Sequence, residues 1–312
     1  MKILIGYDGS QNSIAMIDDL KLAGLPSDTE ALVMSVAEMW LVPPPSYGLA
    51  QTDYVESFQL DVRLAKEIAE KGSTQLKAHF PTWKVTTEST IGSPARELLK
   101  KASMFHPDLI VVGSQGLSAI GRFLLGSVSQ KVVTEAHSSV RIARGRLQET
   151  NEPARIIIGA DGSPESNEAI RSVASRKWPR GTEVVLLAAT GKILVNEYKA
   201  MIGASLPENT STEVQTQQHD ELTNIKRVLE EALEAQLRAQ GLFVSTIIKE
   251  GDPRKVLLEE AEKWGADAIF IGSRGFSKIK RLVLGSVSTA ISARAHCSVE
   301  VVRLTEKNQN PL

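Results

Sequence analysis

The run Gly113-Ser114-Gln115-Gly116 is followed after nine residues by Gly126-Ser127-Val128-Ser129. The same spacing recurs as Gly272-Ser-Arg-Gly275 and Gly285-Ser286-Val287-Ser288. In both copies an aliphatic run leads into the first glycine, and a helix-compatible segment begins at Ser-Val-Ser. A buried strand, a glycine loop and a helix have therefore been written twice, which indicates a duplicated α/β unit.

Other residues of the two repeats also correspond at fixed offsets, and the glycine runs themselves are 159 positions apart. Gly92, for example, recurs 159 positions later as Gly251. Nearer the front, Asp8-Gly9-Ser10 recurs 153 positions later as Asp161-Gly162-Ser163. The second repeat thus carries six extra residues after its second strand, and we place them in a surface loop, where insertions are tolerated.

Length and composition bound the function classes. A chain of 312 residues fits two ordinary domains, which we predict at 1–145 and 154–305 with a polar linker at 146–153. The formal net charge of -1 provides no basic field for nucleic acid or for an anionic membrane surface. We therefore expect neither as a partner.

Cysteine usage and hydropathy point to a cytoplasmic protein. The lone Cys297 excludes an internal disulfide and a multi-cysteine zinc site, which favours a reducing compartment. The apolar run at residues 1–6 is too short for the hydrophobic region of a signal peptide, and we predict a strand there. No apolar stretch approaches the roughly 20 residues that span a bilayer.

Near-continuous Val/Ile/Leu runs alternate with helical patterns along both repeats. In the first repeat we predict strands at 2–7, 30–37, 84–89, 108–112 and 139–143, and helices at 10–24, 53–80, 94–105 and 127–136. In the second we predict strands at 155–160, 183–189, 243–249, 268–271 and 299–302, and helices at 164–177, 213–240, 253–264 and 286–295. Such alternation predicts an α/β fold with a doubly wound, Rossmann-like parallel sheet in each half.

Asp8 and Asp161 follow the first strand of their repeats. In an open parallel sheet, ligands bind beyond the carboxyl ends of the strands, where the strand order reverses. Each carboxylate could accept a hydrogen bond from a sugar hydroxyl or an adenine amino group. An Asx-turn or a helix cap is the common alternative for such an aspartate. The glycine cradle in the same repeat favours the ligand role.

The cradle gains its chemistry from missing side chains. Gly113 and Gly116 let the backbone approach a phosphate, and Gly126 allows close approach at the next helix start. Ser127 and Ser129 lie in the first turn of that helix, where unpaired amides and the dipole favour negative charge. Serine is often only a cap at such a position. Duplication at identical spacing favours phosphate binding, with Gly272, Gly275, Gly285, Ser286 and Ser288 in the same roles.

Arg122 and Arg281 occupy equivalent places in the nine-residue span. Their guanidinium forks could contact outer phosphates, although a solvated loop arginine is an equal alternative. The chain has no Gly-x-x-x-x-Gly-Lys-Ser/Thr loop and no Gly-x-Gly-x-x-Gly after a first strand, which argues against a standard NTPase or a dinucleotide dehydrogenase. No catalytic residue or metal site is predicted.

In these glycine spans and aspartates the chain resembles the universal stress protein family in its tandem form. The ATP-binding members of that family carry Gly-x2-Gly-x9-Gly-Ser/Thr. Both glycine spans match that signature, and the resemblance covers nearly the whole chain. The resemblance implies five parallel strands in the order 3-2-1-4-5 and domain pairing through the last strand, as an internal pseudo-dimer, with a homodimer as a further possibility. Many relatives end in His-Ala-Pro-Cys-Pro-Val, whereas this chain lacks those prolines after His137 and His296.

The resemblance also implies ATP as ligand, with Mg²⁺, adenine held near Val36 and Ala189, and ribose and phosphates at the cradle. The nucleotide-binding residues expected in the first repeat are Asp8, Val36, Val112, Gly113, Gly116, Arg122, Gly126, Ser127, Val128 and Ser129. Those expected in the second are Asp161, Ala189, Ile271, Gly272, Gly275, Arg281, Gly285, Ser286, Val287 and Ser288.

The function expected from these features is an ATP-binding stress-response or signalling protein that acts through an unknown protein partner. A slow ATPase or autophosphorylating enzyme is an alternative, for which only serines such as Ser127 and Ser286 are visible candidates. A scaffold that binds another adenine nucleotide is a third reading.

Overall fold

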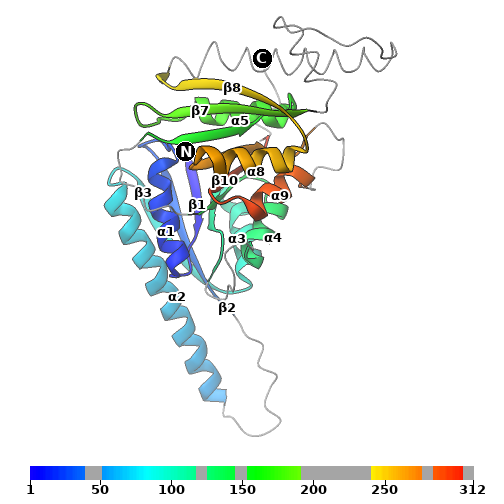
Figure 1. The fold of residues 1–312 in the computed structure, drawn as a ribbon. Coiled ribbons are helices and arrows are strands. Elements are labelled where there is room, and N and C mark those ends of the chain that lie inside the picture. Colours follow the sequence, from blue (N-terminus) through cyan, green and yellow to red (C-terminus); the bar gives the residue numbers. More distant parts are fainter. Residues whose placement is uncertain (39–50, 117–124, 145–152, 191–239, 276–283, 305–312) are drawn as a thin grey trace, which may run out of the picture. The chain divides into compact units, whose positions relative to one another are not determined.

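The computed structural model describes the chain except for residues 39–50, 117–124, 145–152, 191–239, 276–283 and 305–312 (Figure 1). The chain forms two compact units. Unit 1 holds Met1–Lys21 and Leu25–Leu147, and unit 2 holds Leu22–Gly24 and Gln148–Leu312.

Unit 1 contains a five-stranded sheet with the order β3-β2-β1-β4-β5, in which the pairs β3–β2, β2–β1, β1–β4 and β4–β5 are parallel. Its strands are β1 (Lys2–Gly6), β2 (Glu30–Glu38), β3 (Lys84–Gly92), β4 (Leu109–Gly113) and β5 (Ser139–Ala143). Its helices are α1 (Gln11–Asp19), α2 (Gln51–His79), α3 (Pro94–Phe105) and α4 (Ser127–Glu135), and the 3-10 turn η1 (Leu20–Leu22) follows α1. This order confirms the predicted α/β fold.

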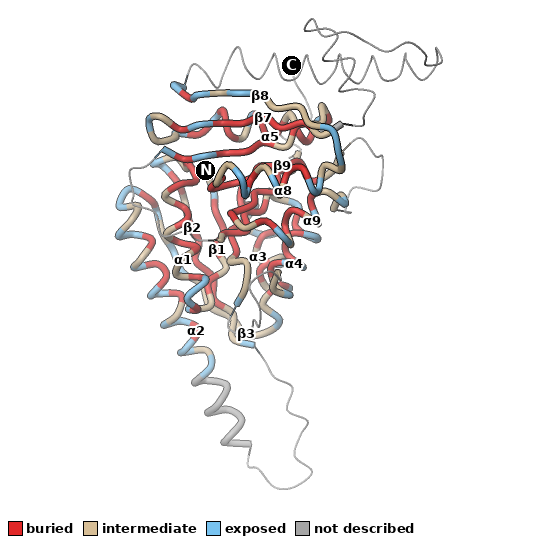
Figure 2. Tube along the Cα trace, in the orientation of Figure 1, coloured by how far each residue is buried: buried red, intermediate tan, exposed pale blue. Residues whose placement is uncertain are grey.

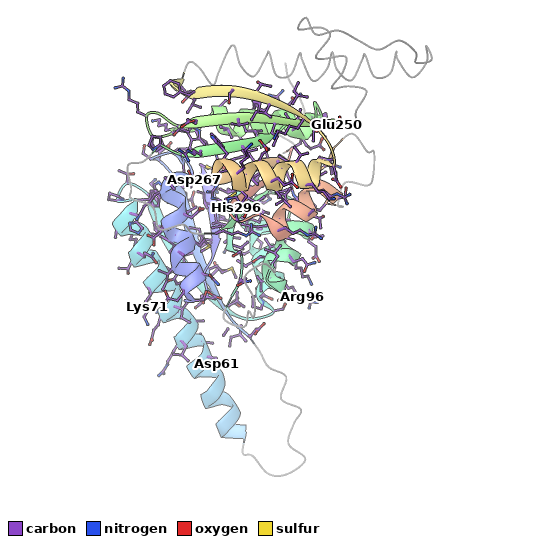
Figure 3. All side chains as sticks on the ribbon, in the orientation of Figure 1. Asp61, Lys71, Arg96, Glu250, Asp267 and His296 are labelled. Atoms are coloured by element: carbon purple, nitrogen blue, oxygen red, sulfur yellow. The ribbon has the colours of Figure 1, made fainter. Side chains whose placement is uncertain are left out.

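The helices of unit 1 cover both faces of its sheet. Helix α1 packs beside α2, and α3 packs beside α4 (Figure 1). Asp61 and Lys71, labelled in Figure 3, lie on the exposed side of α2, while Ala65, Ala69 and Leu76 are buried on its inner side. This spacing gives α2 the apolar stripe of an amphipathic helix.

Unit 2 repeats the arrangement, with the order β8-β7-β6-β9-β10 and parallel neighbours. Its strands are β6 (Arg155–Gly159), β7 (Glu183–Thr190), β8 (Phe243–Glu250), β9 (Ala268–Gly272) and β10 (Ser298–Val302). Its described helices are α5 (Pro164–Ala174), α8 (Pro253–Trp264) and α9 (Ser286–Arg294). The helix predicted at 213–240 lies almost entirely outside the described residues.

The central strands form the core of each unit, as the burial colours of Figure 2 show. Ile3, Leu4 and Ile5 of β1 are fully buried, and all five residues of β9 are buried. A strand with helices on both faces must be apolar on both sides, which explains the unbroken aliphatic runs. The edge strands β3 and β8 have more exposed residues than the central ones.

Some element ends differ from those predicted. The first helix was predicted to reach residue 24, but α1 ends at Asp19, and the chain tightens into η1 ahead of Gly24, whose φ is +62°. Strand β3 was predicted to end at 89, but its pairing with β2 continues to Gly92. Within the described residues, no helix is both long and apolar enough to cross a membrane.

Candidate functional site

A tight turn after β1 positions Asp8. Gly9 has a φ of +76°, a conformation that glycine adopts at little cost. Oδ1 of Asp8 accepts the Ser10 N–H at 3.0 Å, and the Ser10 side chain caps α1 by accepting the Ser13 N–H at 3.1 Å. The Asx-turn considered from the sequence is therefore present, and it uses one oxygen of the carboxylate.

Unit 2 builds the same turn after β6. Gly162 has a φ of +82°, and Oδ1 of Asp161 accepts the Ser163 N–H at 2.9 Å. Ser163 caps α5 by accepting the Ser166 N–H at 3.2 Å. The two aspartates thus have the same local support.

The second oxygen of each carboxylate faces the glycine cradle. A Cβ atom placed on Gly116 would lie 2.8 Å from Oδ2 of Asp8, and one on Gly275 would lie 2.7 Å from Oδ2 of Asp161. A side chain at either glycine would displace the carboxylate. The cradle follows β4, the neighbour of β1, and in unit 2 it follows β9, the neighbour of β6. Both sites therefore lie at the carboxyl ends where the strand order reverses.

Backbone hydrogen bonds close each cradle. The N–H of Gly126 donates to the Ser114 carbonyl at 2.8 Å, and the N–H of Gly285 donates to the Ser273 carbonyl at 2.9 Å. These two amides tie the N-cap of each helix to the loop that follows the preceding strand, so they are not available to a ligand. The first-turn amides that follow, at 127–129 and 286–288, have no acceptor within their own helices. They are the donors that suit an anion.

The serines of each Ser-Val-Ser run divide into two roles. Ser127 and Ser286 are exposed at the first positions of α4 and α9. Ser129 and Ser288 are buried, and their hydroxyls donate to the carbonyls of the first cradle glycines, at 2.5 Å to Gly113 and 2.7 Å to Gly272. The buried serines thus brace the loop, whereas the exposed ones are open to a ligand.

The remaining candidate residues fall into three groups. Val112 and Ile271 are core residues. Their side chains would touch a Cβ atom built on Gly6 and on Gly159, so only their backbone can face a ligand. Partly buried positions are those of Val36, Ala189, Val128 and Val287. Arg122 and Arg281 lie outside the described residues.

Val36 in unit 1 and Ala189 in unit 2 lie on the parts of β2 and β7 that extend beyond the first strand of their unit. β1 pairs with β2 only as far as Met34, and β2 continues past this point beside β3, where Val36 lies opposite Thr90. β7 likewise runs past its last partner on β6 to Ala189. Val36 therefore lies at the same carboxyl end of the sheet as Asp8, and Ala189 lies at the same carboxyl end as Asp161.

One polar pair at the site was missed from the sequence. Nη2 of Arg274 donates to Oε1 of Glu165 at 2.6 Å, joining the cradle of unit 2 to the first turn of α5. The equivalent residues of unit 1 are the neutral Gln115 and Asn12. The partners are 109 positions apart, so no local pattern links them. The available signal was that both positions change together between the repeats.

Two pKa shifts distinguish the surroundings of the sites. Burial, followed by the charge of Asp8, raises the pKa of Tyr7 above 10.0, and a hydrogen bond with Ser13 lowers it in part. In unit 2, burial and then the nearby charge of Arg274 lower the pKa of Arg303 to about 10. Tyr7 has no counterpart in unit 2, where Ala160 follows the first strand.

Comparison with known proteins places this geometry in a family. The model of the universal stress protein family matches residues 1–144 and again residues 153–303. A universal stress protein of Mycolicibacterium smegmatis is 28% identical over 302 residues, which cover 96% of each chain. One of Mycobacterium tuberculosis is 26% identical over 310 residues, again 96% of each chain.

A solved structure shows the same fold over the whole length. The crystal structure of a universal stress protein from Archaeoglobus fulgidus superposes with a TM-score of 0.64 at 21% identity, and covers 97% of this chain and 98% of its own. This chain therefore shares its fold of two successive α/β domains with a solved structure.

Proposed function

The chain belongs to the universal stress protein family, and we propose that it binds one ATP in each of its two units. The observation that carries this proposal is the approach of the Asp8 carboxylate to Gly116, repeated by Asp161 and Gly275. A carboxylate beside a glycine loop and a helix N-terminus offers an acceptor for a nucleoside and donors for phosphates within one small region.

Each part of the nucleotide has a proposed partner. Adenine packs near Val36 or Ala189, and Asp8 or Asp161 accepts a hydrogen bond from the nucleoside. Phosphates lie against the glycine loops and the first-turn amides, with the exposed Ser127 and Ser286 as further donors. Arg122 and Arg281 remain proposed contacts for outer phosphates.

We propose that Mg²⁺ enters with the phosphates. Within the described residues, no group of three or more His, Cys, Asp or Glu side chains could hold a metal ion. Mg²⁺ commonly keeps several waters and binds substrate phosphates with one or two carboxylates, so it needs no dedicated protein cage.

The proposed role is nucleotide-dependent stress response or signalling in the cytoplasm, through a protein partner. A ligand that binds only the folded state stabilises it, so ATP occupancy would tune the stability of each unit and thereby partner choice. From the family resemblance we also propose that domains pair through their last strands, within one chain or between two chains.

The matched variants Asp8→Asn and Asp161→Asn test ATP binding. Asparagine keeps an oxygen acceptor for the Asx-turn and removes the charge. In calorimetric titration with ATP and Mg²⁺, nucleotide-stripped wild type should bind two ATP per chain. Each single variant should lose about tenfold affinity at one site, as expected for a lost charged hydrogen bond. A folded wild type that binds no ATP would refute the proposal.

The exposure of Ser127 and Ser286 keeps a slow ATPase or autophosphorylating enzyme as a second candidate. Phosphate release or phosphoprotein formation well above background, abolished in the double variant Ser127→Ala and Ser286→Ala, would favour that enzyme. Competition by ADP and AMP in the same titrations would reveal a preference for another adenine nucleotide.

A further inference from the structure

The ion pair Glu165–Arg274 distinguishes the cradle of unit 2 from that of unit 1. Arg274 lies between the first two cradle glycines of unit 2, and Glu165 lies in the first turn of α5. Unit 1 has Gln115 and Asn12 at the same positions. A charged pair has therefore replaced a neutral one at the edge of a proposed phosphate site.

The backbone places both central residues alike. The Cα atom of Arg274 lies 3.4 Å from a Cβ built on Gly285, the N-cap of α9. The Cα atom of Gln115 lies at the same 3.4 Å from a Cβ built on Gly126, the N-cap of α4. The two side chains therefore start from equivalent points beside a helix N-terminus, and the difference between them is chemical.

Within the pair, the cation is the outer member. The side chain of Arg274 is 25% exposed, and that of Glu165 is 9% exposed. A guanidinium carries five N–H donors in a rigid fork, so contact with one carboxylate leaves donors for a second anion. Glu165 thus holds the Arg274 guanidinium, while a quarter of the Arg274 side chain stays exposed.

A second guanidinium lies near the first. Arg303, after β10, is partly buried, and the charge of Arg274 contributes to lowering its pKa to about 10. An arriving anion would lessen this repulsion between like charges. In unit 1, Arg144 takes the place of Arg303, but Gln115 supplies no charge beside it.

We propose that Arg274 is a specificity-determining residue of unit 2, which binds the outer phosphoryl groups of a nucleotide while Glu165 positions its guanidinium. Unit 2 then selects ligands by phosphate charge more strongly than unit 1. This inference rests on the proposed nucleotide binding and adds that the two sites have different ligand preferences.

The test measures each site by itself in the full-length chain. Gly116→Val disables unit 1, and Gly275→Val disables unit 2, because each added side chain strikes the neighbouring aspartate. ATP and AMP are titrated into both chains by calorimetry. The ratio of ATP affinity to AMP affinity should be about tenfold higher for unit 2, the value expected of one additional charged contact.

Substitutions then place the neutral residue of unit 1 in unit 2, and the charged pair of unit 2 in unit 1. In the chain with only unit 2 active, Arg274→Gln should weaken ATP about tenfold and change AMP by less than about twofold. Arg274→Lys keeps the charge without the fork and should weaken ATP by a smaller factor. In the chain with only unit 1 active, the pair Asn12→Glu and Gln115→Arg should raise the ratio of ATP affinity to AMP affinity.

Arg171→Gln is the matched control, because Arg171 pairs with Glu168 one turn further along α5 at 3.1 Å. It should leave both affinities unchanged. Equal ratios for the two units, or equal effects of Arg274→Gln on ATP and AMP, would overturn the inference while the proposed function stands. Absence of binding to folded wild type would overturn both.

Discussion

The cradles of the two units share a sequence signature but differ in how tightly they are packed. A Cβ on Gly272 would lie 2.8 Å from the backbone carbonyl carbon of Glu165, well inside normal contact. A Cβ on Gly113 would meet its nearest atom, the Gln115 carbonyl oxygen, at 3.4 Å. The same glycine is thus required by the packing of α5 in unit 2, whereas in unit 1 its neighbours leave room for a methyl group.

This difference shows that one motif position can have different physical reasons in two copies. In unit 2 the first glycine allows a helix to approach the end of the strand. In unit 1 that approach is looser, so the packing of α1 does not by itself require a glycine there, and the proposed ligand would supply a reason for one. The second glycines behave alike, since both face an aspartate carboxylate at less than 3 Å.

The largest expected effect comes from the matched substitutions Gly272→Ala and Gly113→Ala. The methyl group at 272 strikes backbone that cannot rotate away, so Gly272→Ala should cost unit 2 about 1–3 kcal/mol of unfolding free energy. Gly113→Ala should change unit 1 by about 0.5 kcal/mol or less. Urea unfolding, with hydrogen exchange of β9 and β4 to separate the units, measures both.

The result also bears on binding. Gly272→Ala should weaken ATP binding in unit 2 and leave unit 1 unchanged, because the displaced α5 carries Glu165 and the turn after Asp161. Equal losses of stability in the two variants would contradict the packing difference. A stable Gly272→Ala protein would mean that α5 can shift at little cost.

The sequence was sufficient for the architecture and for the location of the cradles. Unbroken aliphatic strands and helical periodicity are local signals, and duplication allowed each repeat to support the reading of the other. The strand order that the family resemblance implies makes β1 and β4 neighbours, so Asp8 and the glycine loop, which follow these strands, were expected at the same carboxyl end of the sheet.

The finer partners within the site depend on tertiary geometry and could not be read from spacing. The hydroxyls of Ser129 and Ser288, which were predicted as donors beside the phosphates, donate to cradle carbonyls, and contact of these residues with a phosphate stays a prediction. The side chain of Val112 is in the core, so the predicted contact of this residue with the nucleotide, which stays a prediction, could involve only its backbone. Glycine signatures specify where backbone must pass closely, and they do not specify which hydrogen bonds the loop makes with itself.

A smaller difference between the units should appear at alkaline pH. Tyr7 is 5% exposed, and its pKa in the folded chain is raised above the ordinary value of 10.0. Above that pH the unfolded chain loses the phenol proton while the folded chain retains it. The contribution to stability is therefore complete below pH 10.0 and is lost as pH rises through the folded pKa.

Tyr7→Phe should flatten this decline in unit 1. Unit 2, with Ala160 at the equivalent position, should show no change in the same variant. Unfolding free energies of wild type and variant, followed across the alkaline range by hydrogen exchange in each unit, provide the comparison. A decline of the same slope in both proteins would show that other groups control the alkaline stability of unit 1.

The smallest expected effect concerns the helices that follow the third strands. Asp252 caps α8 by accepting the Arg254 N–H, whereas Ser93 makes no side-chain cap to α3. Hydrogen bonds from the Arg254 side chain and then from its backbone lower the pKa of Asp252 to about 2, from 3.8. This contribution is present above pH 3.8 and is lost as pH falls toward about 2.

Asp252→Ala should therefore lower the melting temperature of unit 2 slightly at neutral pH, and Ser93→Ala should leave unit 1 nearly unchanged. Because Arg254 is exposed and Asp252 is partly exposed, added salt should weaken the charged part of the effect. Thermal unfolding at several pH values measures the difference from wild type, which should narrow below pH 3.8. A difference that stayed constant with pH and salt would assign the effect to helix geometry and not to the carboxylate charge.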